Sequence, residues 1–325
     1  MAKNGKSLRK TVAKKSVKSA IVVTVYNEAD NIKDLVQSFR TQTLPPTEVI
    51  IVDGGSGDDT FDLLKSEAKR WSNLKVFQKK GNRSVGRNFG VSQSKSPLIA
   101  FTDAGCRPHA DWLEKLLVPF LDSSVKVVSG FYEGAGNNAF EKSLIPYVLV
   151  MPDKAAKQEF FPATRSMAIR RQVWDESGGF DVNLHHNEDF AYANWLKKMG
   201  IKFTFASTAV VTWFPRKNLS QAAVMFLRFA VGDAQSGIIR PKVKMILARY
   251  LIFTYLFLLA LEWKILMPYI VLLAVIYLIW AIVKNFRYVK VKGGLFWLPA
   301  LQITSDLAVI IGTIMGILTK TNGVS

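Results

Sequence analysis

Two aspartates follow apolar segments, at positions where a carboxylate could bind a metal ion or a polar ligand. Asp103 comes after the apolar residues 98–101, and Asp53 comes directly after residues 49–52. Both segments are typical of short strands that are buried on both faces. A carboxylate is costly to bury there without a partner, and ligands of open α/β sheets lie outside the carboxyl ends of the strands. We therefore predict that Asp103 contacts a metal ion or ligand, with a helix N-cap or turn role as the alternative.

The elements that position these acids alternate between strands and helices. Strands are predicted at residues 20–25, 49–52, 74–78 and 98–101. Helices are predicted after Asp30 as N-cap, at residues 59–69 and around residues 86–90. The alternation indicates a parallel α/β sheet. Asp53 and Asp103 should then converge on one edge of the sheet, which favours the functional interpretation of Asp103.

The second half of the chain adds two acids at the start of a helix. Further strands are predicted at residues 125–131, 164–171, 202–206 and 209–213, and further helices at 141–151, 188–199 and from about 220. Glu188 and Asp189 open the helix at 188–199. Because the helix dipole favours acids at its N-terminus, a capping role is the alternative to a catalytic one.

Composition indicates a membrane portion in this chain of 325 residues, of which 49% are hydrophobic. Residues 246–263, 265–283 and 295–318 are predicted transmembrane helices, because about 20 apolar residues cross a bilayer. Four basic residues lie between the second and third helices: Lys284, Arg287, Lys290 and Lys292. Basic loops favour the cytoplasmic side. We expect an integral protein of the plasma or inner membrane with a cytoplasmic N-terminal domain.

Two charged residues interrupt these apolar stretches. Asp306 lies inside the third stretch, and Arg249 lies inside the first. An ionisable residue inside a membrane helix suggests a functional site. Pairing of Asp306 with Arg249 is the alternative.

The net charge of +18 is concentrated partly at the N-terminus. Residues 1–19 form a predicted disordered basic tail, residues 20–240 a catalytic domain and residues 241–325 a membrane domain. The tail suits anionic membrane lipids. It lacks interleaved aromatic residues, so we expect no specific nucleic-acid binding. The single cysteine, Cys106, excludes an internal disulfide and a cysteine-based zinc site, and we interpret it as a buried filler.

Five motifs occur in order on the predicted elements. They are Val25-Tyr26-Asn27-Glu28, Val52-Asp53-Gly54-Gly55-Ser56, Gly86-Arg87-Asn88-Phe89-Gly90, Phe101-Thr102-Asp103-Ala104-Gly105-Cys106, and Gly178-Gly179-Phe180 with Glu188-Asp189. Together they resemble family 2 glycosyltransferases of the GT-A fold over residues 19–237. The resemblance implies an α/β fold with a GT-A-type, Rossmann-like, mainly parallel sheet flanked by helices. An α-helical transmembrane region would follow it.

The resemblance also implies roles for the motif residues. A nucleotide-sugar donor would contact Tyr26, Asn27, Glu28, Asp53, Gly55, Ser56, Arg83, Arg87, Asn88, Asp103, Ala104 and Gly105. Asp103 matches the first acid of the family's Asp-x-Asp motif, which holds a divalent cation, Mn²⁺ or Mg²⁺, on the diphosphate. Asp189 matches the family's catalytic base, with Glu188 beside it. The expected reaction is a single displacement with inversion at the anomeric carbon.

Two departures from the family pattern affect these expectations. Gly105 replaces the second acid of the metal motif, so the cation would depend on Asp103, phosphates, water and a later residue. Candidates for that residue are Glu188, His185 and His186, with an ordinary loop position as the alternative for the two histidines. The Gln-x-x-Arg-Trp motif of processive synthases is missing, which favours single addition. Arg216 and Arg228 occupy that region and are predicted on the acceptor or phosphate side.

The resemblance implies an acceptor when it is combined with the predicted membrane helices, because several family members with C-terminal membrane helices glycosylate lipid-linked acceptors. The acceptor would be a polyprenyl phosphate or another lipid-linked sugar acceptor in cell-envelope glycan synthesis, with a water-soluble acceptor also open. The alternative to an enzyme is a catalytically inactive GT-A-fold membrane scaffold or sugar-binding protein.

Overall fold

The computed structural model describes residues 18–155 and 159–319, which form two compact units. The first unit, the sheet unit, comprises the chain up to Glu133 and Pro152–Phe214. The second, the helical unit, comprises Gly134–Met151 and the chain from Pro215 onward. Most of the predicted basic tail, residues 1–17, lies outside the described residues. Residues 215–240, which the sequence analysis assigned to the catalytic domain, group with the C-terminal helices.

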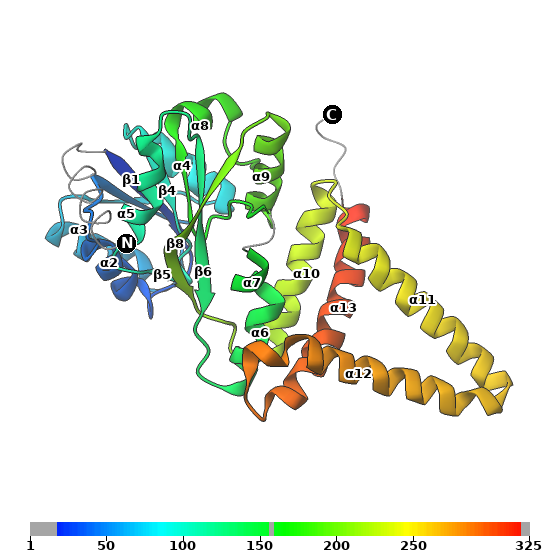
Figure 1. Ribbon diagram of the computed structural model, residues 1–325. Coiled ribbons are helices and arrows are strands. Elements are labelled where there is room, and N and C mark those ends of the chain that lie inside the picture. The colour runs from blue at the N-terminus through cyan, green and yellow to red at the C-terminus, as the bar shows by residue number, and fades with distance from the viewer. Residues whose placement is uncertain (1–17, 156–158, 320–325) are drawn as a thin grey trace. The chain divides into compact units, whose positions relative to one another are not determined.

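An eight-stranded sheet forms the sheet unit, in the order β3-β2-β1-β4-β7-β6-β8-β5 (Figure 1). The strands are β1 Ser19–Val25, β2 Glu48–Asp53, β3 Leu74–Gln78, β4 Leu98–Phe101, β5 Cys106–Pro108, β6 Val127–Gly134, β7 Met167–Arg170 and β8 Phe203–Trp213. The first four strands are parallel, as predicted. Antiparallel pairing of β4 with β7, β6 with β7 and β5 with β8 makes the whole sheet mixed.

The helices of this unit were predicted in part, because those at residues 32–40, 60–70, 83–92 and 188–198 were expected with slightly different ends, whereas those at 112–121, 152–155 and 171–177 were not. They are α2 Ile32–Arg40, α3 Thr60–Arg70, α4 Arg83–Ser92, α5 Trp112–Leu117, the 3₁₀ helix η1 Val118–Leu121, α7 Pro152–Ala155, α8 Arg171–Ser177 and α9 Glu188–Lys198. The prediction that Asp30 caps the first of these was wrong, because Asn31 holds the N-cap position. The two strands predicted at 202–206 and 209–213 form the single strand β8. The exposed residues Ser207 and Thr208 interrupt the apolar pattern of the sequence, but the strand continues through them.

One core cluster explains the two glycines of α4. Apolar residues of β1, β2 and β4, among them Val22, Val52 and Phe101, pack with residues of α8 and α9 on one side of the sheet. A Cβ at Gly86 would lie 2.6 Å from Cγ2 of Thr24, and a Cβ at Gly90 would lie 2.7 Å from Cγ1 of Val22. These glycines therefore let α4 approach the sheet closely enough to carry Arg87 to its edge.

The helical unit contains the three apolar helices expected from the sequence. Its elements are α6 Ala139–Val148, α10 Leu219–Gln235, α11 Pro241–Glu262, the 3₁₀ turn η2 Lys264–Leu266, α12 Met267–Val289 and α13 Gly294–Leu318. By length and composition, α11, α12 and α13 are each able to cross a membrane. Helix α10 runs beside α13 (Figure 1). A Cβ at Gly312 would lie 2.6 Å from the backbone oxygen of Leu227, so small residues permit this contact.

Asp306 is paired inside this unit. Its side chain is 1% exposed, and Nη2 of Arg249 donates to its Oδ2 at 2.6 Å. Nε2 of Gln302 donates to Oδ1 at 3.0 Å, and the hydroxyl of Tyr277 donates to Oδ2. The structure thus shows the pairing with Arg249 that the sequence analysis held as the alternative to a functional site.

Candidate active site

Asp103 directly follows β4 at the carboxyl end of the parallel strands. Its side chain is 31% exposed, and Nη2 of Arg87 donates to its Oδ1 at 2.9 Å. Burial raises the pKa of this carboxyl, but the cations of Arg87, Arg165 and Arg83 outweigh burial and hold the pKa below its usual value. Asp103 is therefore a stable anion with part of its surface open to a ligand.

Arg87 is a buried link between two parts of the site. Its side chain is 3% exposed, and its second terminal nitrogen pairs with Glu188, whose side chain is 4% exposed. Burial opposes the charge of Arg87, but Glu188 and Asp103 outweigh it and raise the pKa of the guanidinium. Both residues were predicted to belong to the site, but their burial leaves them little surface to contact a nucleotide-sugar or a sugar acceptor. They join α4, the end of β4 and the start of α9.

Asp189 differs from its neighbour Glu188. Its Oδ2 lies 3.3 Å from the backbone nitrogen of Thr164 and 3.4 Å from the Thr164 hydroxyl, both long contacts. Burial and the adjacent Glu188 charge raise the pKa of Asp189, and the charge of Asp103 adds to this effect. Arg165 and Arg87 oppose the shift. A carboxylate with a raised pKa is a better proton acceptor than an ordinary aspartate.

Sequence reasoning missed Arg165. Its guanidinium lies over the ring of Tyr132 at 5.5 Å and over that of Trp213 at 5.9 Å. Burial lowers the pKa of this group, whereas Tyr132, Asp103 and Asp189 raise it, and the net shift is upward. The available signal was one of three arginines in the predicted strand 164–171, and arginines are also common at surfaces. Arg165 lies in the turn before β7, and only the structure shows that its charge acts to lower the pKa of both Asp103 and Asp189.

The loops after β1 and β2 carry five of the twelve predicted donor residues. The backbone nitrogen of Asn27 donates to Oγ of Ser56 at 2.8 Å, and Oδ1 of Asn27 accepts from the backbone nitrogen of Gly57 at 2.9 Å. The backbone nitrogen of Glu28 donates a hydrogen bond to the hydroxyl oxygen of Thr60. These bonds join the two loops, and the Tyr26 side chain beside them is 63% exposed. Tyr26 is thus available to stack on a planar ligand.

Asp53 and Asn88 hold the backbone at this edge. Asp53 is fully buried and accepts hydrogen bonds from the backbone of Gly55 at 3.1 Å and of Ser56 at 3.0 Å. Nε2 of Gln78 and the Ser56 hydroxyl also donate to it. Asn88 donates to the Phe180 oxygen at 2.8 Å and accepts from the Phe180 nitrogen at 3.0 Å. The hydrogen bonds of both side chains therefore stabilise the fold at this edge of the sheet.

The residues after Asp103 offer little for a metal ion. No group of three histidine, cysteine or acidic side chains with metal-binding geometry occurs among the described residues. Gly105 has no side chain, and Ala104 and Cys106 are buried. Burial also raises the pKa of the Cys106 thiol, as expected for a filler residue. One carboxylate still suits Mg²⁺, which is often held by one or two carboxylates with substrate phosphates and water.

Two predicted arginines belong to the other unit. Arg216 and Arg228 are exposed residues of the helical unit, the second on α10. Their predicted place on the acceptor or phosphate side stays a prediction.

Comparisons with known proteins find glycosyltransferases among the proteins similar to this chain. The family model described as Glycosyl transferase family 2 matches residues 20–179. Glycosyltransferase AglE of Haloferax volcanii is 28% identical over 224 residues, covering 66% of this chain and 72% of that protein. The O-antigen chain rhamnosyltransferase RfbN of Salmonella typhimurium is 24% identical over 208 residues, covering 60% and 66%. The chain spans 66% or less of several curated relatives.

Solved structures show the same fold. The mannosyltransferase PcManGT from Pyrobaculum calidifontis, solved in complex with GDP-Man and Mn²⁺, has a TM-score of 0.58 and 18% identity. The match covers 94% of this chain and 88% of that one. The sheet unit is therefore of GT-A type, as the sequence motifs indicated.

Proposed function

Because residues 20–179 form a family 2 glycosyltransferase domain, we propose that this chain moves a sugar from a nucleotide-sugar donor to an acceptor by single displacement with inversion. One observation carries the proposal. Asp103 and Asp189 stand at one edge of the sheet with pKa values shifted in opposite directions. Paired acids whose environments separate their pKa values have separate chemical roles. Asp103 serves as a permanent anion, and Asp189 serves as a base.

The acceptor would lose its proton to Asp189. The acceptor oxygen attacks the anomeric carbon, its proton passes to the carboxylate of Asp189, and the bond to the nucleoside diphosphate breaks on the opposite face. Glu188 positions Arg87 and raises the basicity of Asp189 without accepting the proton itself. If the acceptor is already a phosphate, Asp189 positions it and removes no proton.

Negative charge develops on the leaving diphosphate, and both arginine side chains and a divalent cation would stabilise it. Arg165 and the exposed Arg83 are cations close enough to lower the pKa of Asp103, so they act on the same region. A divalent cation held by Asp103 would neutralise the diphosphate. Tyr26, being exposed at the end of β1, would stack on the nucleotide base.

The membrane helices support a lipid-linked acceptor. Three helices of the same chain are apolar enough to cross a bilayer, and the basic residues between α12 and α13 favour the cytoplasmic side. The acceptor would be a polyprenyl phosphate or a lipid-linked glycan of the cell envelope, reached from the cytoplasmic face of the membrane.

Nucleotide release tests the proposal. Detergent-solubilised full-length protein is incubated with UDP-, GDP- and dTDP-sugars, with Mn²⁺ or Mg²⁺ against EDTA, and with or without polyprenyl phosphate. Asp103→Ala and Asp189→Ala should abolish release, whereas Asp62→Ala, at an exposed position of α3, should not. Release that survives EDTA would exclude the cation but keep the enzyme. Donor binding without release under every condition would favour the inactive scaffold instead.

A further inference from the structure

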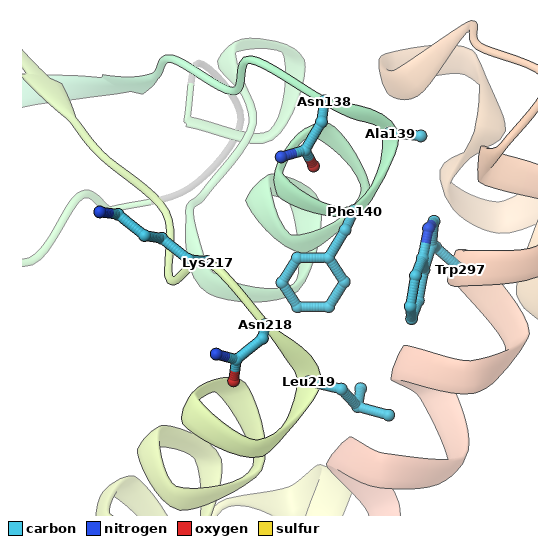
Figure 2. A pocket seen from close by; sticks show the side chains of 7 residues that line it. All are labelled: Asn138, Ala139, Phe140, Lys217, Asn218, Leu219 and Trp297. Atoms are coloured by element: carbon cyan, nitrogen blue, oxygen red, sulfur yellow. The ribbon is translucent and has the colours of Figure 1, made fainter.

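The helical unit contains a pocket of about 430 Å³ where α6, α10 and α13 begin (Figure 2). Its lining residues are Asn138, Ala139, Phe140, Lys217, Asn218, Leu219 and Trp297. The rings of Phe140 and Trp297 meet edge to face with centroids 4.9 Å apart. Figure 2 shows Leu219 close to these two rings, so one side of the pocket is apolar.

The opposite side of the pocket is polar and carries one charge. Asn138 and Asn218 accept hydrogen bonds from the backbone of Glu141 and Gln221, so their side-chain oxygens cap α6 and α10. Lys217 is exposed at the rim, and its side chain extends away from Trp297 (Figure 2). The nearby acid Glu141 accepts hydrogen bonds from Asn137 and Asn138. Lys217 is therefore the charged group that the pocket itself offers to a ligand.

Basic and apolar surfaces border the pocket. A Cβ at Gly293 would lie 2.6 Å from Cβ of Ala139, which places the segment between α12 and α13 against the pocket wall. This segment contains Lys290 and Lys292. On α13, the side chains of Leu295 and Phe296, directly before Trp297, are 52% and 67% exposed. Lysines, a tryptophan and exposed apolar side chains meet in this way at the level of lipid headgroups.

We propose that this pocket binds an anionic phospholipid of the bilayer. The lipid phosphate pairs with Lys217, and the first part of the acyl chains packs against Phe140, Leu219 and Trp297. The positive charge of the bordering lysines is complementary to the headgroup and attracts it from the anionic leaflet. The inference rests on the membrane association in the proposed function. It assigns the start of α13 to the headgroup layer.

Lipid retention by the full-length protein tests this site. The protein is purified in a mild non-ionic detergent, exposed to phosphatidylglycerol or phosphatidylcholine, and examined by native mass spectrometry. Lys217→Met should weaken phosphatidylglycerol binding about fivefold, the effect of one lysine at a membrane surface. Lys217→Arg should keep the binding, and Trp297→Ala should weaken both lipids. Lys202→Met, at an exposed lysine of the sheet unit, is the matched control.

Two results would overturn the inference. One is equal retention of phosphatidylglycerol by the wild type and Lys217→Met while thermal unfolding shows both to be folded. The other is displacement of the lipid by millimolar inorganic phosphate, which would identify a free-phosphate site. Because the readout is lipid binding and not nucleotide release, failure of this inference is distinguishable from failure of the proposed function.

Discussion

Replacing Arg87 with methionine should destabilise the sheet unit strongly. The substitution leaves Glu188, whose side chain is 4% exposed, without its ion-pair partner, whereas Asp103 at 31% can be hydrated. Removing one partner of a buried ion pair costs about 3–5 kcal/mol. For a unit of this size, that loss lowers the unfolding temperature by about 6–20 °C. The measurement is thermal unfolding of the detergent-solubilised full-length protein, followed by tryptophan fluorescence.

A second substitution separates the charge effect from lost packing. Arg87→Met with Glu188→Leu removes both buried charges, so the double variant should recover much of the lost stability. Arg40→Met is the control, because Arg40 pairs with Glu67 at 3.1 Å while remaining one-third exposed, and its loss should cost at most about 1 kcal/mol. If the double variant unfolds at or below the temperature of Arg87→Met, the buried charge of Glu188 is not the cause.

Three further outcomes follow from the site and its support. Glu188→Gln removes a charge that raises the pKa of Asp189, so the acidic limb of the kcat profile should move to lower pH; a limb that stays or rises contradicts the assignment of the base. Arg165→Lys should lower kcat/KM by roughly 10- to 150-fold, because a charged hydrogen bond contributes about 1.5–3 kcal/mol, with the unfolding temperature unchanged as the check on folding. Gly86→Val should cost about 2 kcal/mol by overpacking, whereas Gly57→Val, with nothing within 4 Å of its Cβ position, should stay within about 0.5 kcal/mol in urea unfolding.

The parallel half of the fold could be predicted because its signals are local. Apolar runs that end in Asp53 and at Asp103 mark strands, and a glycine-spaced helix lies between them. In the antiparallel half, β6, β7 and β8 were predicted as strands, but their antiparallel pairing was not. Strand β5 was missed, since it contains only Cys106, Arg107 and Pro108 and exists through its pairing with β8. A strand of three residues is too short for its sequence pattern to indicate which distant segment it pairs with.

In the candidate site, too, the sequence predicted which residues take part but not which partners they contact. The motifs located Asp103 and Asp189, but they gave no indication that Arg87 is sealed between Asp103 and Glu188. Burial and partner choice depend on residues 16 and 101 positions away along the chain. Arg165 was missed for the same reason, because its role depends on the aromatic rings of Tyr132 and Trp213 that enclose it.

The pairing of Arg249 with Asp306 has a consequence for the biosynthesis of the chain. Arg249 leaves the ribosome 57 residues before Asp306, so α11 and α12 are made while the arginine has no counter-charge. If α11 spans the bilayer as proposed, an unpaired Arg249 is costly there, and the ion pair can form only after α13 has been made. A chain cut before α13 would therefore leave Arg249 without its carboxylate partner.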